Sequence, residues 1–204
     1  DLLAKVGYIF VVRQRRVALE SLRIAFGKEK SENEIKEIAR ATFESLAKGM
    51  VELLFFMERP LLVKKRVKII GKEHLDRAFQ EGNGAIGVSA HFGNFPLMLL
   101  KFVQEGYKTN AIIRYARDEK VEKYFQRKRT ELGLKTIYSQ PRKACVEASI
   151  KSLRDNELLF IPLDQNFGTG GVFVEFFGRQ AATATGPIVF ALRTKAPILP
   201  MFII

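Results

Sequence analysis

The feature that most limits the possible folds is a change in hydrophobic pattern near residue 60. Before that point, apolar residues recur every three or four positions, as in the run from Ile35 through Leu46 to Met57, and this spacing indicates a helix. Pro60 is expected to end it. Beyond Pro60, short apolar runs alternate with helical patterns, which is typical of βα units. The chain is therefore predicted to be an α/β protein, with a mostly parallel central sheet flanked by helices and an N-terminal helical portion.

The same pattern predicts the individual elements. A basic amphipathic helix, or two, is expected over residues 2–26, either packed on a core or lying on a membrane surface, and a loop at 27–33 precedes the helix that starts at Glu34. The expected strands are 67–70, 84–90, 109–114, 134–138, 157–163, 172–176 and 197–204, and the expected later helices are 72–81, 95–105, 118–132, 141–154 and 184–195.

No repeat or linker divides the chain, so we expect a single domain over residues 1–204. It would comprise N-terminal helices at 1–60 and an α/β core at 61–204. The sequence begins at Asp1 rather than at a methionine and stops inside an apolar run, so we expect truncation at both ends.

The charge balance predicts an acidic partner. Lys and Arg number 34 against 22 Asp and Glu, a formal net charge of +12, and basic clusters occur at 64–66 and 127–129. Nucleic acid, an anionic membrane surface, an acidic protein or a phosphorylated substrate would each suit this charge. No nucleic-acid-binding motif is present, which argues against the first. A single Cys excludes a disulfide framework and a cysteine-built zinc site, and no metal is expected.

His91 is the first candidate for chemistry. It follows the apolar run 84–90 and precedes a helix expected to begin near Phe95, so it falls at the carboxyl end of a predicted strand, where open α/β sheets bind ligands. Histidine there can act as a general base, or it can simply cap the helix. His74 is expected to be a surface residue, and Cys145, in a predicted helix, is expected to be structural.

Four sequence blocks carry a family resemblance. The segment His91-Phe92-Gly93-Asn94 resembles the first block of the glycerolipid and lipid A acyltransferases, and most of all the late acyltransferases of lipid A biosynthesis. Three further blocks agree with that family in order and spacing, and they are Ile113-Arg114, the run 163–166 (Leu-Asp-Gln-Asn) and the run 172–186 with its Phe-Phe-Gly and Thr-rich stretches. Residues 196–200 resemble the family's closing strand. The resemblance covers nearly the whole chain and implies a glycerolipid-acyltransferase-like fold.

One position departs from the family pattern. Where the family has an acidic residue, five positions after its histidine, this chain has Pro96. A carboxylate at that place would orient the imidazole, which proline cannot do. Proline is acceptable in a first helical turn, so the fold should persist. Three explanations stay open: another carboxylate such as Asp164 supports His91, His91 works unaided, or the protein is a weakened or inactive relative.

The resemblance implies transfer of a fatty acyl group from a thioester on acyl carrier protein to a hydroxyl of a lipid A precursor. His91 would accept the hydroxyl proton, Arg114 would stabilise the oxyanion or hold a phosphate, and Asp164 would support His91 or hold the headgroup. The alternative for Arg114 is a surface ion pair with Asp118. The substrate-binding candidates are Asn94, Gln165, Phe177, Gly178, Thr183 and Thr185, of which Thr185 also suits a helix N-cap. Phe173 and Phe176 are further candidates for an acyl-chain groove.

The resemblance also implies partners and a location. No cofactor is expected beyond the acyl thioester as co-substrate. The protein would work at the cytoplasmic face of the bacterial inner membrane, peripherally or through an anchor outside this chain, on an anionic lipid surface. Two alternatives are kept: a related acyltransferase for phosphatidylinositol mannosides that uses acyl-CoA, and a lipid-binding relative that has lost turnover.

Overall fold

The computed structural model describes residue 8 and residues 11–204, with the side chain of Thr169 excepted. Contacts within the chain divide it into two compact units, residues 1–55 with 175–180 and residues 56–174 with 181–204. Each unit is described by itself below. The prediction of one domain stays a prediction.

Among its described residues, the N-terminal unit contains the helices α2 (Val12–Phe26) and α3 (Glu32–Met57). The predicted helical positions Leu2, Val6, Ile9 and Phe10 lie outside the described residues. Helix α2 has no fully buried residue. Helix α3 begins two residues earlier than predicted because Ser31 and Glu34 form a capping box: the Ser31 amide donates to Glu34 Oε2 at 2.8 Å, and the Glu34 amide donates back to Ser31 Oγ at 3.4 Å.

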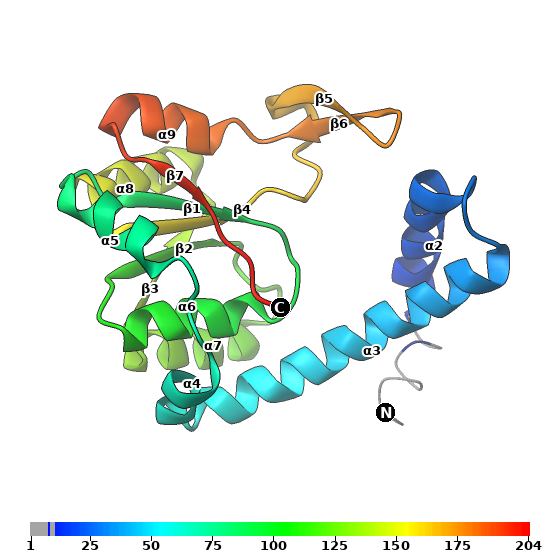
Figure 1. Cartoon of the computed structure of the whole chain (residues 1–204), viewed down its shortest axis with the longest axis horizontal. Helices are drawn as coiled ribbons and strands as arrows, with labels where there is room; N and C mark the ends of the chain where they lie inside the picture. Colours follow the sequence, from blue (N-terminus) through cyan, green and yellow to red (C-terminus); the bar gives the residue numbers. More distant parts are fainter. Residues whose placement is uncertain (1–7, 9–10) are drawn as a thin grey trace. The chain divides into compact units, whose positions relative to one another are not determined.

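The second unit contains the predicted parallel sheet (Figure 1). Its strand order is β3-β2-β4-β1-β7, and every neighbouring pair is parallel. The strands are β1 (Ala85–Ser89), β2 (Thr109–Ile113), β3 (Leu134–Tyr138), β4 (Leu158–Pro162) and β7 (Ile198–Pro200). The predicted fold class is confirmed, with helices on both faces of a parallel sheet.

Helices cover the sheet on its two faces (Figure 1). Helices α5 (Lys72–Gln80) and α6 (Phe95–Gln104) pack on one face, and α8 (Arg142–Arg154) and α9 (Gly186–Thr194) on the other. Helix α7 (Glu119–Glu131) packs against β3, and α4 (Pro60–Arg66) against α6. Within the described residues, no helix combines the length and apolarity needed to cross a membrane.

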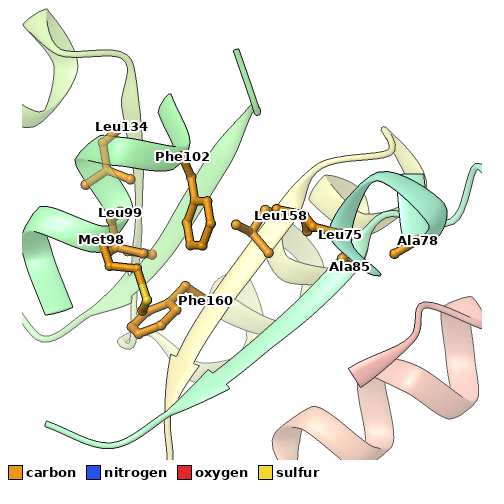
Figure 2. Packing of buried hydrophobic residues seen from close by; sticks show 10 residues of the cluster. Leu75, Ala78, Ala85, Met98, Leu99, Phe102, Leu134, Leu158 and Phe160 are labelled. Carbon is orange, nitrogen blue, oxygen red and sulfur yellow. The ribbon is translucent and has the colours of Figure 1, made fainter. Parts of the chain in front are cut away.

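Strand β4 shows why both faces are apolar. Its side chains alternate, so that Leu158 and Phe160 enter the cluster with α5 and α6 while Leu159 and Ile161 enter the cluster with α8 and α9. Figure 2 shows the first cluster, in which Phe160 lies beside Met98 of α6. Burying one such side chain stabilises the fold by about 1.5–3 kcal/mol. The alternating side chains of β4 therefore contribute to the hydrophobic core on both faces of the sheet.

A separate two-stranded sheet follows the first four strands of the parallel sheet in the chain. It consists of β5 (Val172–Phe176) and β6 (Arg179–Thr183), and its connection is only Phe177-Gly178. Both residues have positive φ angles, 50° and 68°, which is the signature of a type I′ hairpin turn. Strand 172–176 was predicted, whereas β6 was not, because its Ala- and Thr-rich sequence lacks a strand-like apolar alternation.

The remaining differences from prediction are a strand that does not form, a strand that ends early and a helix, α4, that was not predicted. Segment 67–70 is not a strand, because no strand within the described residues pairs with it; Ile69 packs on the core and Ile70 is exposed. Strand β7 stops at Pro200, although the Met201 amide still donates to Val88 O at 2.9 Å. Pro60 is not where α3 ends; it begins α4, since proline suits a first helical turn.

Candidate active site

The register of β1 and β4 places His91 opposite Asp164. In these parallel strands Ala85 pairs with Leu158 and Ser89 with Pro162. The Leu163 amide donates to Ser89 O at 2.8 Å, which continues the pairing past the strand ends. The same offset, carried two residues beyond Ser89, makes His91 and Asp164 neighbours on one side of the sheet. This is the carboxyl edge, where open α/β sheets bind their ligands.

Asp164 holds His91 by two hydrogen bonds. The His91 backbone amide donates to Asp164 Oδ2 at 2.8 Å, and Oδ1 lies 2.8 Å from His91 Nδ1. Both side chains are 37% exposed, so a substrate can reach the imidazole. Burial tends to raise the pKa of Asp164, but the hydrogen bonds from the His91 ring and amide outweigh it, and the net pKa lies below the ordinary value. An ionised carboxylate at Nδ1 keeps the proton on that nitrogen and leaves Nε2 able to accept one.

Two neighbours define the rest of the imidazole's surroundings. The Phe95 ring meets it edge-on, with centroids 5.1 Å apart, and Phe95 in turn stacks on Phe160 at 5.9 Å. Gln165 Nε2 lies 3.3 Å from His91 Nε2, a long contact to the atom that would accept a proton. An incoming hydroxyl would take the place of this amide. Phe95 was not predicted as a site residue; its position four residues after His91, on the first turn of α6, is the signal.

Pro96 and Gly93 have structural explanations. Pro96 lies in the first turn of α6, as predicted, and Asp164 occupies Nδ1 of the histidine. The structure therefore has the geometry required by the first of the three explanations for Pro96, that Asp164 supports His91.

Gly93 has a φ of 58°, and a Cβ at this position would overlap the carbonyl oxygen of Ile203. The motif glycine is thus required both by its left-handed backbone and by close packing.

Arg114 lies at the same edge of the sheet. It directly follows β2, which pairs with β4, and its side chain is exposed. The predicted alternative, an ion pair with Asp118, is not formed; the Asp118 carboxylate instead accepts from the Lys120 and Val121 amides and caps α7. Among the residues described, Arg114 has no ion pair. Its guanidinium is available to an anion or a developing oxyanion.

The other predicted site residues occupy defined structural positions. Asn94 is at the N-cap position of α6. Thr185 is at the N-cap position of α9, as predicted, but its side chain makes no capping hydrogen bond. Thr183 ends β6 and donates to Ala181 O at 3.3 Å. Phe177 and Gly178 form the hairpin turn, and Phe177 packs edge-on against Phe26. Phe173 and Phe176 are exposed on β5.

Further predictions concern residues outside the site. His74 is exposed and Cys145 is buried, as expected, and burial raises the pKa of the Cys145 thiol.

The basic cluster 127–129, which was expected to suit an acidic partner, forms ion pairs within the chain instead. Arg127 and Lys128 pair with Glu131, Lys128 also pairs with Glu58, and Arg129 pairs with Glu122. The charges of residues 127–129 are therefore paired with acidic residues of this chain. Lys64, Lys65 and Arg66, by contrast, are exposed at the end of α4.

No group of three or more metal-ligating side chains occurs within the part of the chain that the structure describes. The expectation of a metal-free reaction stays a prediction.

The comparison with known families agrees with the geometry. The chain belongs to the bacterial lipid A biosynthesis acyltransferase family, whose pattern it matches over residues 1–204. The predicted family is therefore confirmed.

Individual relatives are more distant. A phosphatidylinositol mannoside acyltransferase of Mycobacterium tuberculosis (strain CDC 1551 / Oshkosh) is 27% identical over 146 residues, 71% of this chain and 46% of the relative. One of Mycolicibacterium smegmatis is 24% identical over 138 residues, covering 67% and 45%. A lipid A biosynthesis acyltransferase of Haemophilus influenzae is 27% identical over 141 residues, covering 69% and 43%. The chain spans less than half the length of these curated relatives.

Proposed function

We propose that this protein transfers a fatty acyl group from an acyl thioester to a hydroxyl of a lipid A precursor. The observation that carries the proposal is the contact of His91 Nδ1 with Asp164 Oδ1, 2.8 Å long, at the carboxyl edge of the sheet. A partly exposed histidine with an ionised carboxylate behind it is the arrangement that general-base catalysis needs. Family membership supplies the reaction class.

The chemistry assigns one step to each side chain. His91 Nε2 accepts the proton of the acceptor hydroxyl as its oxygen attacks the thioester carbonyl carbon. Asp164 stabilises the imidazolium that forms. Arg114 stabilises the oxyanion of the tetrahedral intermediate or holds a substrate phosphate. The C–S bond then breaks, and the proton on His91 passes to the departing thiolate. Asn94, Gln165, Phe177, Gly178, Thr183 and Thr185 remain the candidates for substrate contacts.

The donor and the location complete the proposal. The donor is acyl carrier protein, an acidic protein that suits a net charge of +12. The protein works at the cytoplasmic face of the bacterial inner membrane, on an anionic lipid surface, either peripherally or through an anchor outside this chain. Exposed Lys64, Lys65 and Arg66 support this location, as each basic residue near such a surface contributes about 1 kcal/mol.

A second candidate acceptor is a phosphatidylinositol mannoside, with acyl-CoA as the donor. Two relatives named for that activity, at 27% and 24% identity, favour it. The same catalytic residues would serve either acceptor, since both reactions move an acyl group to a hydroxyl of a glycolipid.

The test uses the full-length protein with both donors and both acceptors, beside His91→Ala. We expect turnover by the parent with carrier-protein donor and lipid A precursor, and none by His91→Ala. Turnover with acyl-CoA and phosphatidylinositol mannoside alone would select the second candidate. An inactive parent that still binds acyl thioester would contradict both and favour a lipid-binding relative.

A further inference from the structure

A buried carboxylate lies beneath the loop that carries Arg114. Glu122, on α7, is only 2% exposed. It accepts from Arg129 Nη2 at 2.6 Å, from Tyr138 Oη at 3.0 Å and from the Ala116 amide at 2.7 Å. Burial tends to raise its pKa, but these hydrogen bonds outweigh it and keep the pKa below the ordinary value. Glutamate is rarely this buried, and it is so here because all its bonds are made.

The partners of Glu122 connect the loop to β3. Tyr138 is the last residue of β3, and Arg129 also donates through Nε to Thr136 Oγ1 on that strand, at 2.9 Å. One carboxylate oxygen, Oε1, receives both of these side chains. The other, Oε2, receives the amide of Ala116, which lies in the loop between β2 and α7. Glu122 therefore bridges a strand and a loop.

Arg114 opens that same loop, two residues before Ala116. Between them Tyr115 places its ring 5.4 Å from the ring of Tyr138. At the far end of the loop Asp118 caps α7. The segment from 114 to 118 is thus held at three points. It contains two exposed arginines, Arg114 and Arg117, and Arg114 is the one that directly follows β2 at the carboxyl edge of the sheet. No apolar residue in place of Glu122 would hold the Ala116 amide, so packing alone does not explain a carboxylate here.

We infer that Glu122 is a positioning residue for Arg114, fixing the loop so that the guanidinium stays at the carboxyl edge of the sheet beside the His91 site. This inference rests on the proposed acyl transfer, in which Arg114 meets the oxyanion or a phosphate. Electrostatic stabilisation of a transition state depends on donors already in place, and a misplacement of about 1 Å costs about 10²-fold in rate.

The test is a double-mutant cycle in the full-length protein: parent, Glu122→Gln, Arg114→Ala and both together. In Glu122→Gln the single amide oxygen cannot serve both sides. It is expected to stay with the two donors Arg129 and Tyr138, so the Ala116 amide loses its acceptor. We expect kcat/KM to fall at least about tenfold in Glu122→Gln, through kcat, and not to fall further in the Arg114→Ala background.

Glu157→Gln is the matched control. Glu157 is equally buried, at 3%, and is bonded to Lys135 and Asn110, but it lies just before β4, at the opposite edge of the sheet. The substitution Glu157→Gln should lower the melting temperature while leaving kcat within about twofold of the parent's value. If Glu122→Gln does not fold, Tyr138→Phe removes one donor to Glu122 and keeps the ring contact with Tyr115. The effect of Tyr138→Phe on kcat should also disappear when the protein already carries Arg114→Ala.

If the parent is active, two kinetic results would contradict the inference. In the first, the rate losses caused by Glu122→Gln and Arg114→Ala multiply as independent effects in the double mutant. In the second, Glu157→Gln lowers kcat as much as Glu122→Gln does. An inactive parent would overturn the proposed function instead. Amide hydrogen exchange then still decides the positioning role. Ala116 should be protected in the parent and in Glu157→Gln, and at least about tenfold less protected in Glu122→Gln. Unprotected Ala116 in the parent would overturn the inference.

Discussion

Replacing Asp164 with asparagine tests the catalytic pair with almost no change in volume. In Asp164→Asn the side-chain oxygen can still accept from the His91 amide, which leaves the new NH₂ group facing Nδ1. That NH₂ donates, so it selects the tautomer with the proton on Nε2, the atom that must accept the hydroxyl proton. The imidazole is then held in a form that cannot act as the base.

The magnitude follows from the exposure of the pair. A general base contributes about 10²–10⁴ in rate. Both side chains are 37% exposed, so water can partly replace the carboxylate, and we expect a loss of about 10²–10³ in kcat with little change in KM. The assay is steady-state acyl transfer by the full-length protein. Asp155→Asn, which removes a carboxylate bonded to Lys151 at the surface, is the control and should stay within about twofold.

The lowered pKa of Asp164 gives the pH dependence of stability. A carboxylate with a folded pKa below its unfolded value of about 3.9 stabilises the fold above that pH, and the stabilisation is lost as pH falls through the folded pKa. For a pair this exposed it amounts to at most about 1 kcal/mol. The difference in melting temperature between parent and Asp164→Asn should therefore be present at pH 7 and shrink below about pH 4.

In the acyl-transfer assay described above, activity of Asp164→Asn within about threefold of the parent would refute the catalytic role of the His91–Asp164 pair.

Three further changes test other parts of the structure. Pro96→Glu should leave kcat within about twofold of the parent, because Asp164 already occupies Nδ1; a rise of about tenfold or more, equivalent to about 1.4 kcal/mol, would show that the family's acidic position is still needed. Gly93→Ala should lower the free energy of unfolding by at least about 1–2 kcal/mol in denaturant titration, because φ is 58° and the Cβ would overlap Ile203, and stability equal to the parent's would contradict this geometry. Leu159→Ala should cost about 2–5 kcal/mol in the same assay, since Leu159 is 0% exposed, whereas Leu192→Ala, at an exposed position, should stay within about 0.5 kcal/mol, and equal losses would contradict the assigned core.

Much of the fold was determined by local pattern. Helical spacing predicted α3, and alternating apolar runs predicted all five strands of the parallel sheet, because hydrophobic period depends on neighbouring residues alone. The motif around His91 placed it at a strand end for the same reason. Local pattern failed at 67–70, since whether an apolar run becomes a strand depends on a partner that lies elsewhere in the chain. It failed at β6, whose strand character comes from the turn at Phe177-Gly178.

Tertiary structure alone decided the site. His91 and Asp164 lie on strand ends that are far apart in sequence, and the register of β1 with β4 makes them partners. Sequence could propose Asp164 but could not choose it over an unaided histidine. Glu122 gave no signal at all, because one more glutamate on a charged helix predicts a solvated face. Its burial, and the loop that it holds, follow from the packing of α7 on β3, which no local pattern records.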